Sequence, residues 1–190
     1  MSTSTSSTPS TTTTKPPILL TRHPTSTLHP NASLFPSPSF PITLSAGTII
    51  HPRAQINATY GSVQIGEGCI LWEKCRVGLQ QSLGEEGEGE VMMVVLGRNV
   101  IVEAGAVIQG RSVGDGTVVD AGARVGRGAV IGKHCRITPL TTVPAGAVIE
   151  DFTVLYGDGL KRRGNGVTEE LRARGRERKG EVLRRLVPGR

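Results

Sequence analysis

The side chains of this 190-residue chain that could carry out chemistry are few, with four histidines and three cysteines among them. A catalytic zinc site needs three protein ligands around an open coordination position. Only two of the histidines lie in the regular middle of the chain, 83 residues apart, and the pattern supplies no third ligand. We therefore predict no metal site, no cofactor and no catalytic residue. The histidines are His23, His29, His51 and His134, and the cysteines are Cys69, Cys75 and Cys135.

The cysteines form no CxxC pair and no disulfide framework, which fits a reducing compartment. We expect no secretory signal, because the N-terminus lacks a basic start and an apolar core, and no membrane insertion, because no apolar run is long enough. The net charge of +6 is concentrated at the C-terminus, where residues 161–190 hold 11 Lys or Arg and 4 Glu. Such a segment can bind nucleic acid or an acidic protein surface, but we favour a solvated, partly helical surface segment.

Aliphatic residues recur every six positions, and this repeat indicates the fold. A small or β-branched residue lies two positions before most of them. A period of six fits neither an α-helix nor a hairpin meander, but it fits a short strand followed by a turn. Residues two apart on a strand share a face, so the aliphatic residue and the small one both point inward. The cleanest run is Val113, Val119, Val125, Ile131, Ile137, Val143, Ile149 and Leu155.

Three such strands make one triangular coil, and coils stack at about 4.8 Å, the spacing of paired strands. We predict an all-β solenoid, a left-handed parallel β-helix of hexapeptide repeats with a C-terminal α-helix. This hand is an exception to the right-handed crossover rule. The aromatic share of 3% agrees, because the prism interior is too narrow for rings. The predicted structural core is Ile50, Ile65, Leu71, Val102, Val113, Val119, Val125, Ile131, Ile137, Val143 and Ile149.

The small inward slot also explains the cysteines. Cys69, Cys75 and Cys135 each lie two positions before an inward aliphatic residue, where cysteine acts as a small hydrophobe, and we interpret all three as structural. Glycine often follows the inward residue directly, as Gly126 follows Val125. Gly126→Val should strain the turn if Gly126 has a positive φ.

The N-terminal part of the chain has the composition of a tail. Twelve of the first fourteen residues are Ser or Thr, and we predict that residues 1–17 are disordered because they can bury little apolar surface. Residues 18–43 are predicted to be an irregular Pro-rich segment with a degraded first coil. A weak echo of the repeat begins there at Leu28 and Leu34.

The β-helix is predicted to cover residues 44–157, and a loop at 79–91 interrupts it. This loop carries the acidic stretch 84–90, which we interpret as a solvated loop or as a docking feature for a basic partner. The remaining basic segment, 158–190, is expected to contain a helix at about 176–187 that covers one face of the prism.

The outward slots differ among the three predicted faces. The first face is apolar, with isoleucines, valines and two aromatic residues in its outward slots. The second face gathers Val95, Val130 and Val148, and the third is polar, as at Arg76 and Arg124. We predict that the C-terminal segment covers the first face and that the second face, or an open coil end, meets another protein. The outward valines can equally be residues that simply favour strands. Candidate interface or helix-docking residues, mostly on the first face, are Ile49, Ile70, Trp72, Ile101, Val118, Val154, Tyr156, Leu183 and Leu186.

Two classes of enzyme share such a repeat. The chain is similar to hexapeptide acyltransferases, which use a histidine base near a thioester, but a lone histidine such as His134 is more commonly a bystander. Residues 102–110 resemble the segment of γ-class carbonic anhydrases that carries two zinc-binding histidines. Those two slots hold Ala104 and Gln109 here, and the third falls at Gly78. The comparison therefore implies that this metal site is absent.

Six segments together resemble the dynactin subunit 6 family of β-helical subunits. The resemblance covers about residues 42–188, and the chain departs from the family in its Ser/Thr tail, its degraded first coil and the register of its last hexads. The segments that carry the resemblance are Thr48–Ile56, Val63–Gly68, Leu96–Ile101, Val154–Gly157, Leu160–Arg162 and Leu183–Pro188.

This resemblance implies a non-enzymatic structural subunit of the dynactin pointed-end complex. In that family the β-helix stacks against a sister β-helix, dynactin subunit 5, and the pair caps an actin-related filament and supports dynein adaptor and cargo binding in microtubule-based transport. Contacts with other pointed-end and actin-related subunits, a place in the cytoplasm and cytoskeleton, and no nucleic-acid partner are implied as well. The physics agrees, because the open strand edges of a solenoid's terminal coils invite stacking.

Two alternatives stay open. A hexapeptide-repeat enzyme, γ-carbonic-anhydrase-like or acyltransferase-like, would be supported by a zinc-bearing homotrimer, whereas a defined heteromer without metal supports the structural subunit. Nucleic-acid binding through residues 161–190 is a weaker hypothesis. This hypothesis would be supported by RNA or DNA binding that depends steeply on salt and is lost when residues 161–190 are removed.

Overall fold

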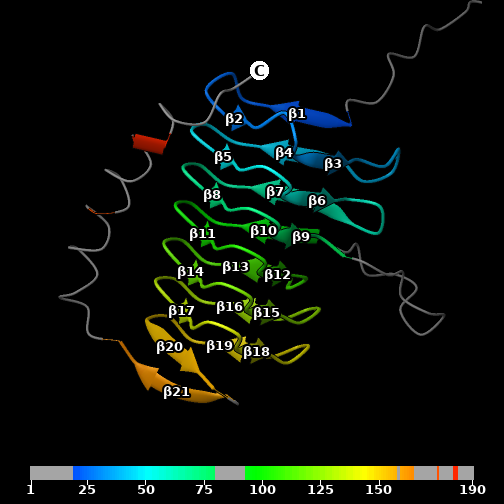
Figure 1. The fold of residues 1–190 in the computed structure, drawn as a ribbon. Helices are drawn as coiled ribbons and strands as arrows, with labels where there is room; N and C mark the ends of the chain where they lie inside the picture. The colour runs from blue at the N-terminus through cyan, green and yellow to red at the C-terminus, as the bar shows by residue number, and fades with distance from the viewer. Residues whose placement is uncertain (1–18, 80–92, 158, 165–174, 176–181, 184–190) are drawn as a thin grey trace, which may run out of the picture.

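The computed structural model describes residues 19–79, 93–157, 159–164, 175 and 182–183. This part of the chain winds as a left-handed parallel β-helix, in which short strands alternate with turns and the coils stack into a prism (Figure 1). Successive strands fall in turn into three sheets, so each strand pairs with the strand one coil further on. The prediction of an all-β hexapeptide solenoid is confirmed.

The three sheets form the three walls of the prism. Sheet A consists of β1 (Leu20–Arg22), β4 (Ile42–Leu44), β7 (Ser62–Ile65), β10 (Met93–Leu96), β13 (Ser112–Val113), β16 (Val130–Ile131) and β19 (Val148–Ile149). Sheet B consists of β2 (Thr27–Leu28), β5 (Ile49–Ile50), β8 (Ile70–Leu71), β11 (Ile101–Val102), β14 (Val118–Val119), β17 (Arg136–Ile137), β20 (Thr153–Tyr156) and β21 (Leu160–Arg163). Sheet C consists of β3 (Ser33–Phe35), β6 (Gln55–Asn57), β9 (Arg76–Val77), β12 (Val107–Ile108), β15 (Arg124–Val125) and β18 (Thr142–Val143).

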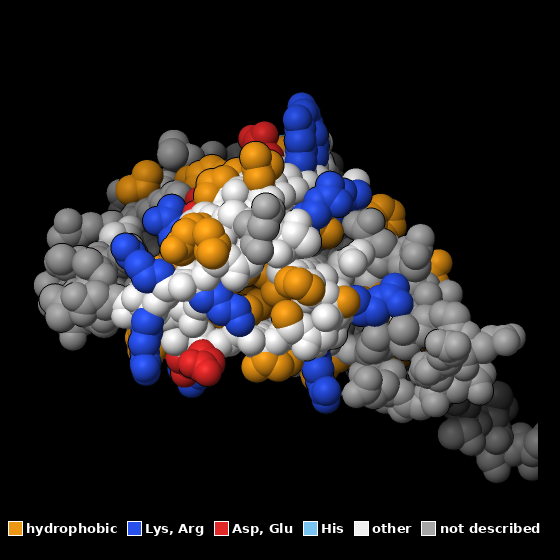
Figure 2. All heavy atoms as spheres, turned by 90° about the horizontal axis from the view of Figure 1, so that it is seen from below, with side chains coloured by type: hydrophobic (Ala, Val, Ile, Leu, Met, Phe, Trp, Pro, Cys, Tyr) orange, Lys and Arg blue, Asp and Glu red, His pale blue; other side chains and the backbone are white. Residues whose placement is uncertain are grey.

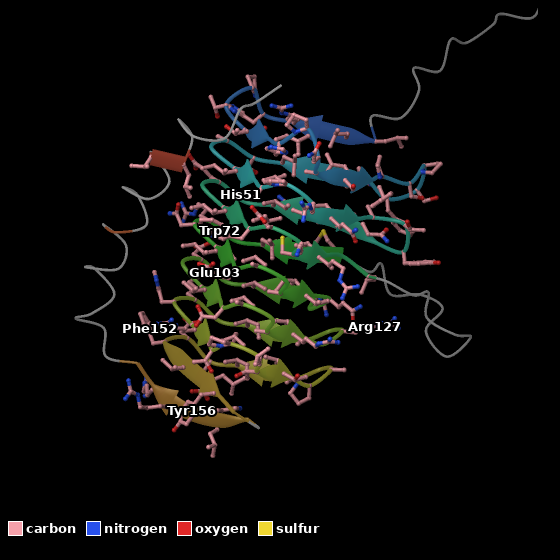
Figure 3. The ribbon with its side chains drawn as sticks, viewed as in Figure 1. His51, Trp72, Glu103, Arg127, Phe152 and Tyr156 are labelled. Carbon is pink, nitrogen blue, oxygen red and sulfur yellow. The ribbon has the colours of Figure 1, made fainter. Side chains whose placement is uncertain are left out.

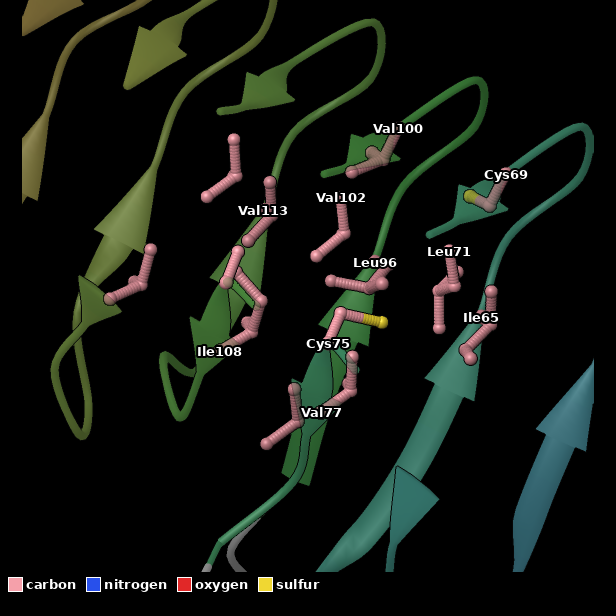
Figure 4. Close-up of a cluster of buried hydrophobic side chains, with 14 of the residues drawn as sticks. Ile65, Cys69, Leu71, Cys75, Val77, Leu96, Val100, Val102, Ile108 and Val113 are labelled. Carbon is pink, nitrogen blue, oxygen red and sulfur yellow. The ribbon is translucent and has the colours of Figure 1, made fainter. Parts of the chain in front are cut away.

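The core is a column of aliphatic side chains along the prism axis (Figure 4). The inward residue of each strand packs between those of the coils above and below, and burial of one such side chain contributes about 1.5–3 kcal/mol. None of the described aromatic residues is fully buried there, which follows from the narrow interior. All eleven residues named above as the structural core are at most 3% exposed: Ile50, Ile65, Leu71, Val102, Val113, Val119, Val125, Ile131, Ile137, Val143 and Ile149.

Left-handed backbone recurs at one turn position, three residues before the inward aliphatic residue. Glycine holds it at Gly105 (φ 70°), and other residues adopt it elsewhere, as at Asn99 (φ 55°). The condition set for Gly126 is not met, because Gly126 is not among the positive-φ glycines. A Cβ atom there would instead lie 2.7 Å from the nitrogen of Ala145 and 2.8 Å from the oxygen of Val143, in the next coil. Close stacking of coils, and not φ, requires this glycine.

The ends of the prism depart from the regular pattern. Strands β1, β2 and β3 build a first coil in the segment 18–43, although Leu20 and Phe35 stay exposed. At the other end β21 turns back and pairs antiparallel with β20, with Tyr156 opposite Leu160. The sequence pattern gave no sign of this hairpin, since β21 carries no inward hexad position.

Several predicted segments lie largely outside the described residues. They are the tail 1–17, nearly all of the loop 79–91 with its acidic stretch 84–90, and most of the helix expected at 176–187. Gly175, Val182 and Leu183 are the C-terminal residues that the structure describes beyond Gly164, and all three are helical.

Candidate protein-interaction surfaces

The outer face of sheet B is apolar and partly covered. Its outward slots on β5, β8 and β11 are in register and hold isoleucines. Although they point away from the core, Ile49, Ile70 and Ile101 are only 0%, 2% and 5% exposed. Figure 1 shows the helical residues 182–183 beside β5, and Leu183 covers part of this face. The half-buried side chains that pack on the three isoleucines are Trp72, Val118 and Leu183.

A ring stack borders this face. His51 and Trp72 follow the inward residues of β5 and β8, and their ring centroids lie 4.4 Å apart with an interplanar angle of 14°. Glu103 holds the same place one coil further on, and Figure 3 shows the three side chains along one edge of the prism. The stack leaves His51 only 7% exposed. Little of the imidazole surface therefore remains for a substrate, and the stack is better suited to rigidify the face.

Two carboxylates hold the turns between coils. The Asp115 carboxylate accepts a hydrogen bond of 2.8 Å from the backbone N–H of Arg98, and its other oxygen lies 3.4 Å from the Arg98 guanidinium and 4.0 Å from Lys133. The N–H bond, followed by the charges of Arg98 and Lys133, lowers the pKa of Asp115. Asp151 accepts the equivalent bond from the Lys133 N–H at 2.7 Å. Sequence reasoning missed both carboxylates, although each lies two residues after an inward aliphatic residue.

The buried cysteines are chemically quiet. Burial raises the pKa of Cys69 and of Cys75 to about 12. Burial also raises the pKa of Cys135. The thiol of Cys69 donates to the carbonyl oxygen of Gly97 at 3.0 Å. Because the thiolate is the nucleophile and these groups stay protonated at neutral pH, their environment suits packing and not catalysis.

The slots compared with zinc ligands offer no imidazole. Gly78 has φ 114°, Ala104 is an exposed turn residue and Gln109 is half-buried. Within the described ranges, His, Cys, Asp and Glu side chains nowhere gather in a group of three that could hold a metal ion. The ring of His134 stacks on Phe152, with centroids 5.2 Å apart. No described helix has the length and apolarity to cross a membrane.

The remaining candidate residues are more exposed. Val154 is half-buried on β20, Tyr156 is exposed at its end, and Leu186 lies outside the described residues. On the outer face of sheet A, Val95 and Val130 are half-buried. These two valines are therefore less buried than the three isoleucines on the outer face of sheet B.

Exposed large hydrophobic side chains gather at the C-terminal end of the prism. Half of the ten found among the described residues lie within residues 140–160. Figure 2 looks onto this end, where hydrophobic atoms lie among polar ones and Lys and Arg project around them. In the described part of the chain no strand follows β18 in sheet C or β19 in sheet A. The five residues are Leu140, Val148, Phe152, Tyr156 and Leu160, with Leu140 81% exposed.

The fold and these surfaces define a class, the hexapeptide-repeat β-helix proteins. No family model matches the sequence. A hexapeptide transferase family protein from Anaplasma phagocytophilum has a TM-score of 0.69, with 87% of this chain and 91% of that chain covered at 14% identity. At so low an identity the likeness shows the fold alone.

Curated relatives identify the family. Dynactin subunit 6 of Xenopus tropicalis is 31% identical over 124 residues, covering 64% of this chain and 62% of the relative. That of Danio rerio is 30% identical over 125 residues, covering 64% of each. That of Nematostella vectensis is 31% identical over 124 residues, covering 64% of this chain and 67% of the relative. The chain belongs to the dynactin subunit 6 family, and its match spans less than two thirds of the first two relatives.

Proposed function

We propose that this chain is a non-catalytic structural subunit of a dynactin pointed-end complex, acting in the cytoplasm and cytoskeleton in microtubule-based transport. The observation that carries the proposal is the similarity to three relatives that are each named dynactin subunit 6. The proposed partner is a sister β-helix, dynactin subunit 5. With other pointed-end and actin-related subunits the pair caps the filament and, indirectly, supports dynein adaptors.

The C-terminal coil end is the surface that best suits this partner. It combines exposed side chains such as Leu140 and Val148 with the edge strands β18 and β19. Edge strands and exposed apolar surface both favour association with another chain. A second β-helix offers a triangular end of the same shape, so stacking buries the apolar residues of both.

The histidines support a role without catalysis. An acyl-transfer base must reach its substrate with a free ring edge. His51 is buried against Trp72, and the ring of His134 is stacked on Phe152. Neither arrangement resembles a histidine held ready in an open cleft.

The decisive experiment measures mass and zinc content of the full chain, alone and mixed with dynactin subunit 5. We expect a metal-free monomer that forms a one-to-one complex in multi-angle light scattering. A zinc-bearing homotrimer that ignores this partner would overturn the proposal in favour of an enzyme.

Two variants test the proposed surface separately from the proposed function. Val148→Asp puts a charge on the C-terminal end and is expected to abolish the complex. Val182→Asp, at another exposed valine away from that end, is expected to leave it intact. If Val148→Asp still pairs normally, the subunit role survives but the partner binds elsewhere.

A further inference from the structure

A basic groove crosses the outer face of sheet C in the first three coils. It has a volume of about 430 Å³, and its walls come from β3, β6 and β9 and from the turns before them. The strand residues Ser33, Gln55 and Arg76 stand in register on successive coils. The turn residues form a parallel column beside them, in which the Arg53 N–H donates to the Asn31 carbonyl at 2.9 Å. The lining residues are Asn31, Ser33, Arg53, Gln55, Lys74 and Arg76.

Among the described residues, the cations of this groove have no acidic partner. Three of the six described lining residues are cations, the other three are neutral hydrogen-bonding residues, and no carboxylate of the described residues lines the groove. Some basic residues of the prism have acidic partners, as Arg136 has Asp120 at 2.8 Å and Arg98 has Asp115. Arg53, Lys74 and Arg76 make no such ion pair with any described residue.

We propose that this groove binds an acidic peptide segment of a partner protein, with several Asp or Glu side chains in succession. The backbones of adjacent coils are about 4.8 Å apart, and the long side chains of Arg53, Lys74 and Arg76 extend from two of them, so neighbouring carboxylates of one extended segment can each reach a guanidinium or ammonium group. The amide and hydroxyl groups of Asn31, Ser33 and Gln55 are available to the peptide backbone. The inference does not rest on the dynactin role, because it concerns a different face from the coil end.

The geometry favours this ligand over two others. The groove is open and its cations are exposed, so each single ion pair is weak and only a ligand with several spaced charges gains enough. This argues against one free phosphate ion. Single-stranded nucleic acid binds through aromatic stacking as well as charge, and none of the described residues that line the groove is aromatic.

The test titrates the isotope-labelled full chain with an octaglutamate peptide at low salt and follows backbone amide shifts by NMR. We expect the shifts to cluster at the six lining residues. The triple variant R53Q/K74Q/R76Q should weaken binding about tenfold or more. The matched variant K161Q/R162Q/R163Q removes three exposed cations from β21 and should weaken it less than about twofold.

Four results would overturn the proposal. Equal weakening in both triple variants would indicate diffuse attraction to a basic chain, and shifts centred elsewhere would place the ligand on another surface. The groove would be a nucleic-acid site if an octauridylate RNA bound more tightly than the peptide and if the R53Q/K74Q/R76Q variant weakened that RNA binding. The chain's own acidic stretch would be the competing occupant of the groove if the peptide bound only after four glutamates of that stretch were changed to Gln. These residues are Glu85, Glu86, Glu88 and Glu90.

Discussion

The outer faces of sheets B and C are built on the same backbone and have opposite surfaces. In sheet B the outward slots hold isoleucines, which are buried beneath Leu183 and neighbouring side chains. In sheet C the equivalent slots hold residues such as Gln55, Arg76 and Arg124, which stay exposed. The inward slots of both sheets are equally aliphatic and equally buried.

The difference between the two outer faces shows that the inward and outward residues of a two-residue strand have separate roles. The inward residue determines whether the coil forms, because of the two strand residues it alone enters the core. The outward residue determines what the finished wall contacts, whether Leu183 on sheet B or, as proposed above, an acidic peptide segment on sheet C. A change in the inward slot should therefore be costly on any wall, whereas a change in the outward slot should matter only where that wall is covered.

The largest effect is expected from adjacent residues of β15, one inward and one outward. Val125→Asp buries an unpaired charge and should destabilise the fold by about 4 kcal/mol or more, a large share of a typical domain's stability. Arg124→Asp places the same side chain in solvent on sheet C and should change stability by less than about 0.5 kcal/mol. Urea unfolding followed by circular dichroism measures both. Wild-type stability in Val125→Asp would mean that the inward assignment is wrong.

The contrast between inward and outward slots was predictable from sequence because it has a strict period. From Val113 to Leu155 every sixth residue is inward, and the observed registers confirm it, as in the pairing of Val119 with Ile137. The three faces followed from the same counting, and the observed registers place Ile49, Ile70 and Ile101 on one face of sheet B.

Features that depend on contacts between coils could not be predicted in this way. Arg53 and Lys74 are 21 residues apart in sequence, and only the stacking of turns makes them neighbours in one groove. The same holds for Gly126, since a positive φ and a close backbone approach both favour glycine and the sequence alone does not distinguish them. The hairpin of β20 and β21 could not be predicted either, because β21 follows the last hexad and its residues show no repeat.

The next largest effect distinguishes these two reasons for glycine. Gly126→Asn should cost about 3 kcal/mol, because its Cβ would collide with the backbone of the next coil. Gly146→Asn should cost less than about 1 kcal/mol, because φ is 69° there, nothing lies within 4 Å, and asparagine tolerates this conformation. Equal melting temperatures for the two variants would contradict the close-approach explanation.

A smaller effect tests whether the wall of sheet B is truly covered. Leu183→Asp puts a charge against the isoleucine cluster, and it should cost less than about 2 kcal/mol while the coils stay folded. Trp72, the single tryptophan, packs on the same cluster and should show a red-shifted emission as water reaches it. Adding Leu186→Asp should increase the shift. Val182→Asp, at an exposed neighbouring position, is the control and should leave the spectrum unchanged.

The smallest effect concerns the turns that join the walls, where Asp115 receives the N–H of Arg98. Because the folded protein lowers the pKa of Asp115 below its ordinary value of 3.8, the charged form stabilises the fold above that pH. This contribution is lost as the pH falls through the lowered pKa. Asp115→Asn keeps an acceptor oxygen but removes the charge, so it should cost less than about 1 kcal/mol at neutral pH. Melting curves of both proteins should converge as the solution approaches about pH 2. If the difference in melting temperature between the two proteins stayed constant with pH, Asp115 would act through its shape and not through its charge.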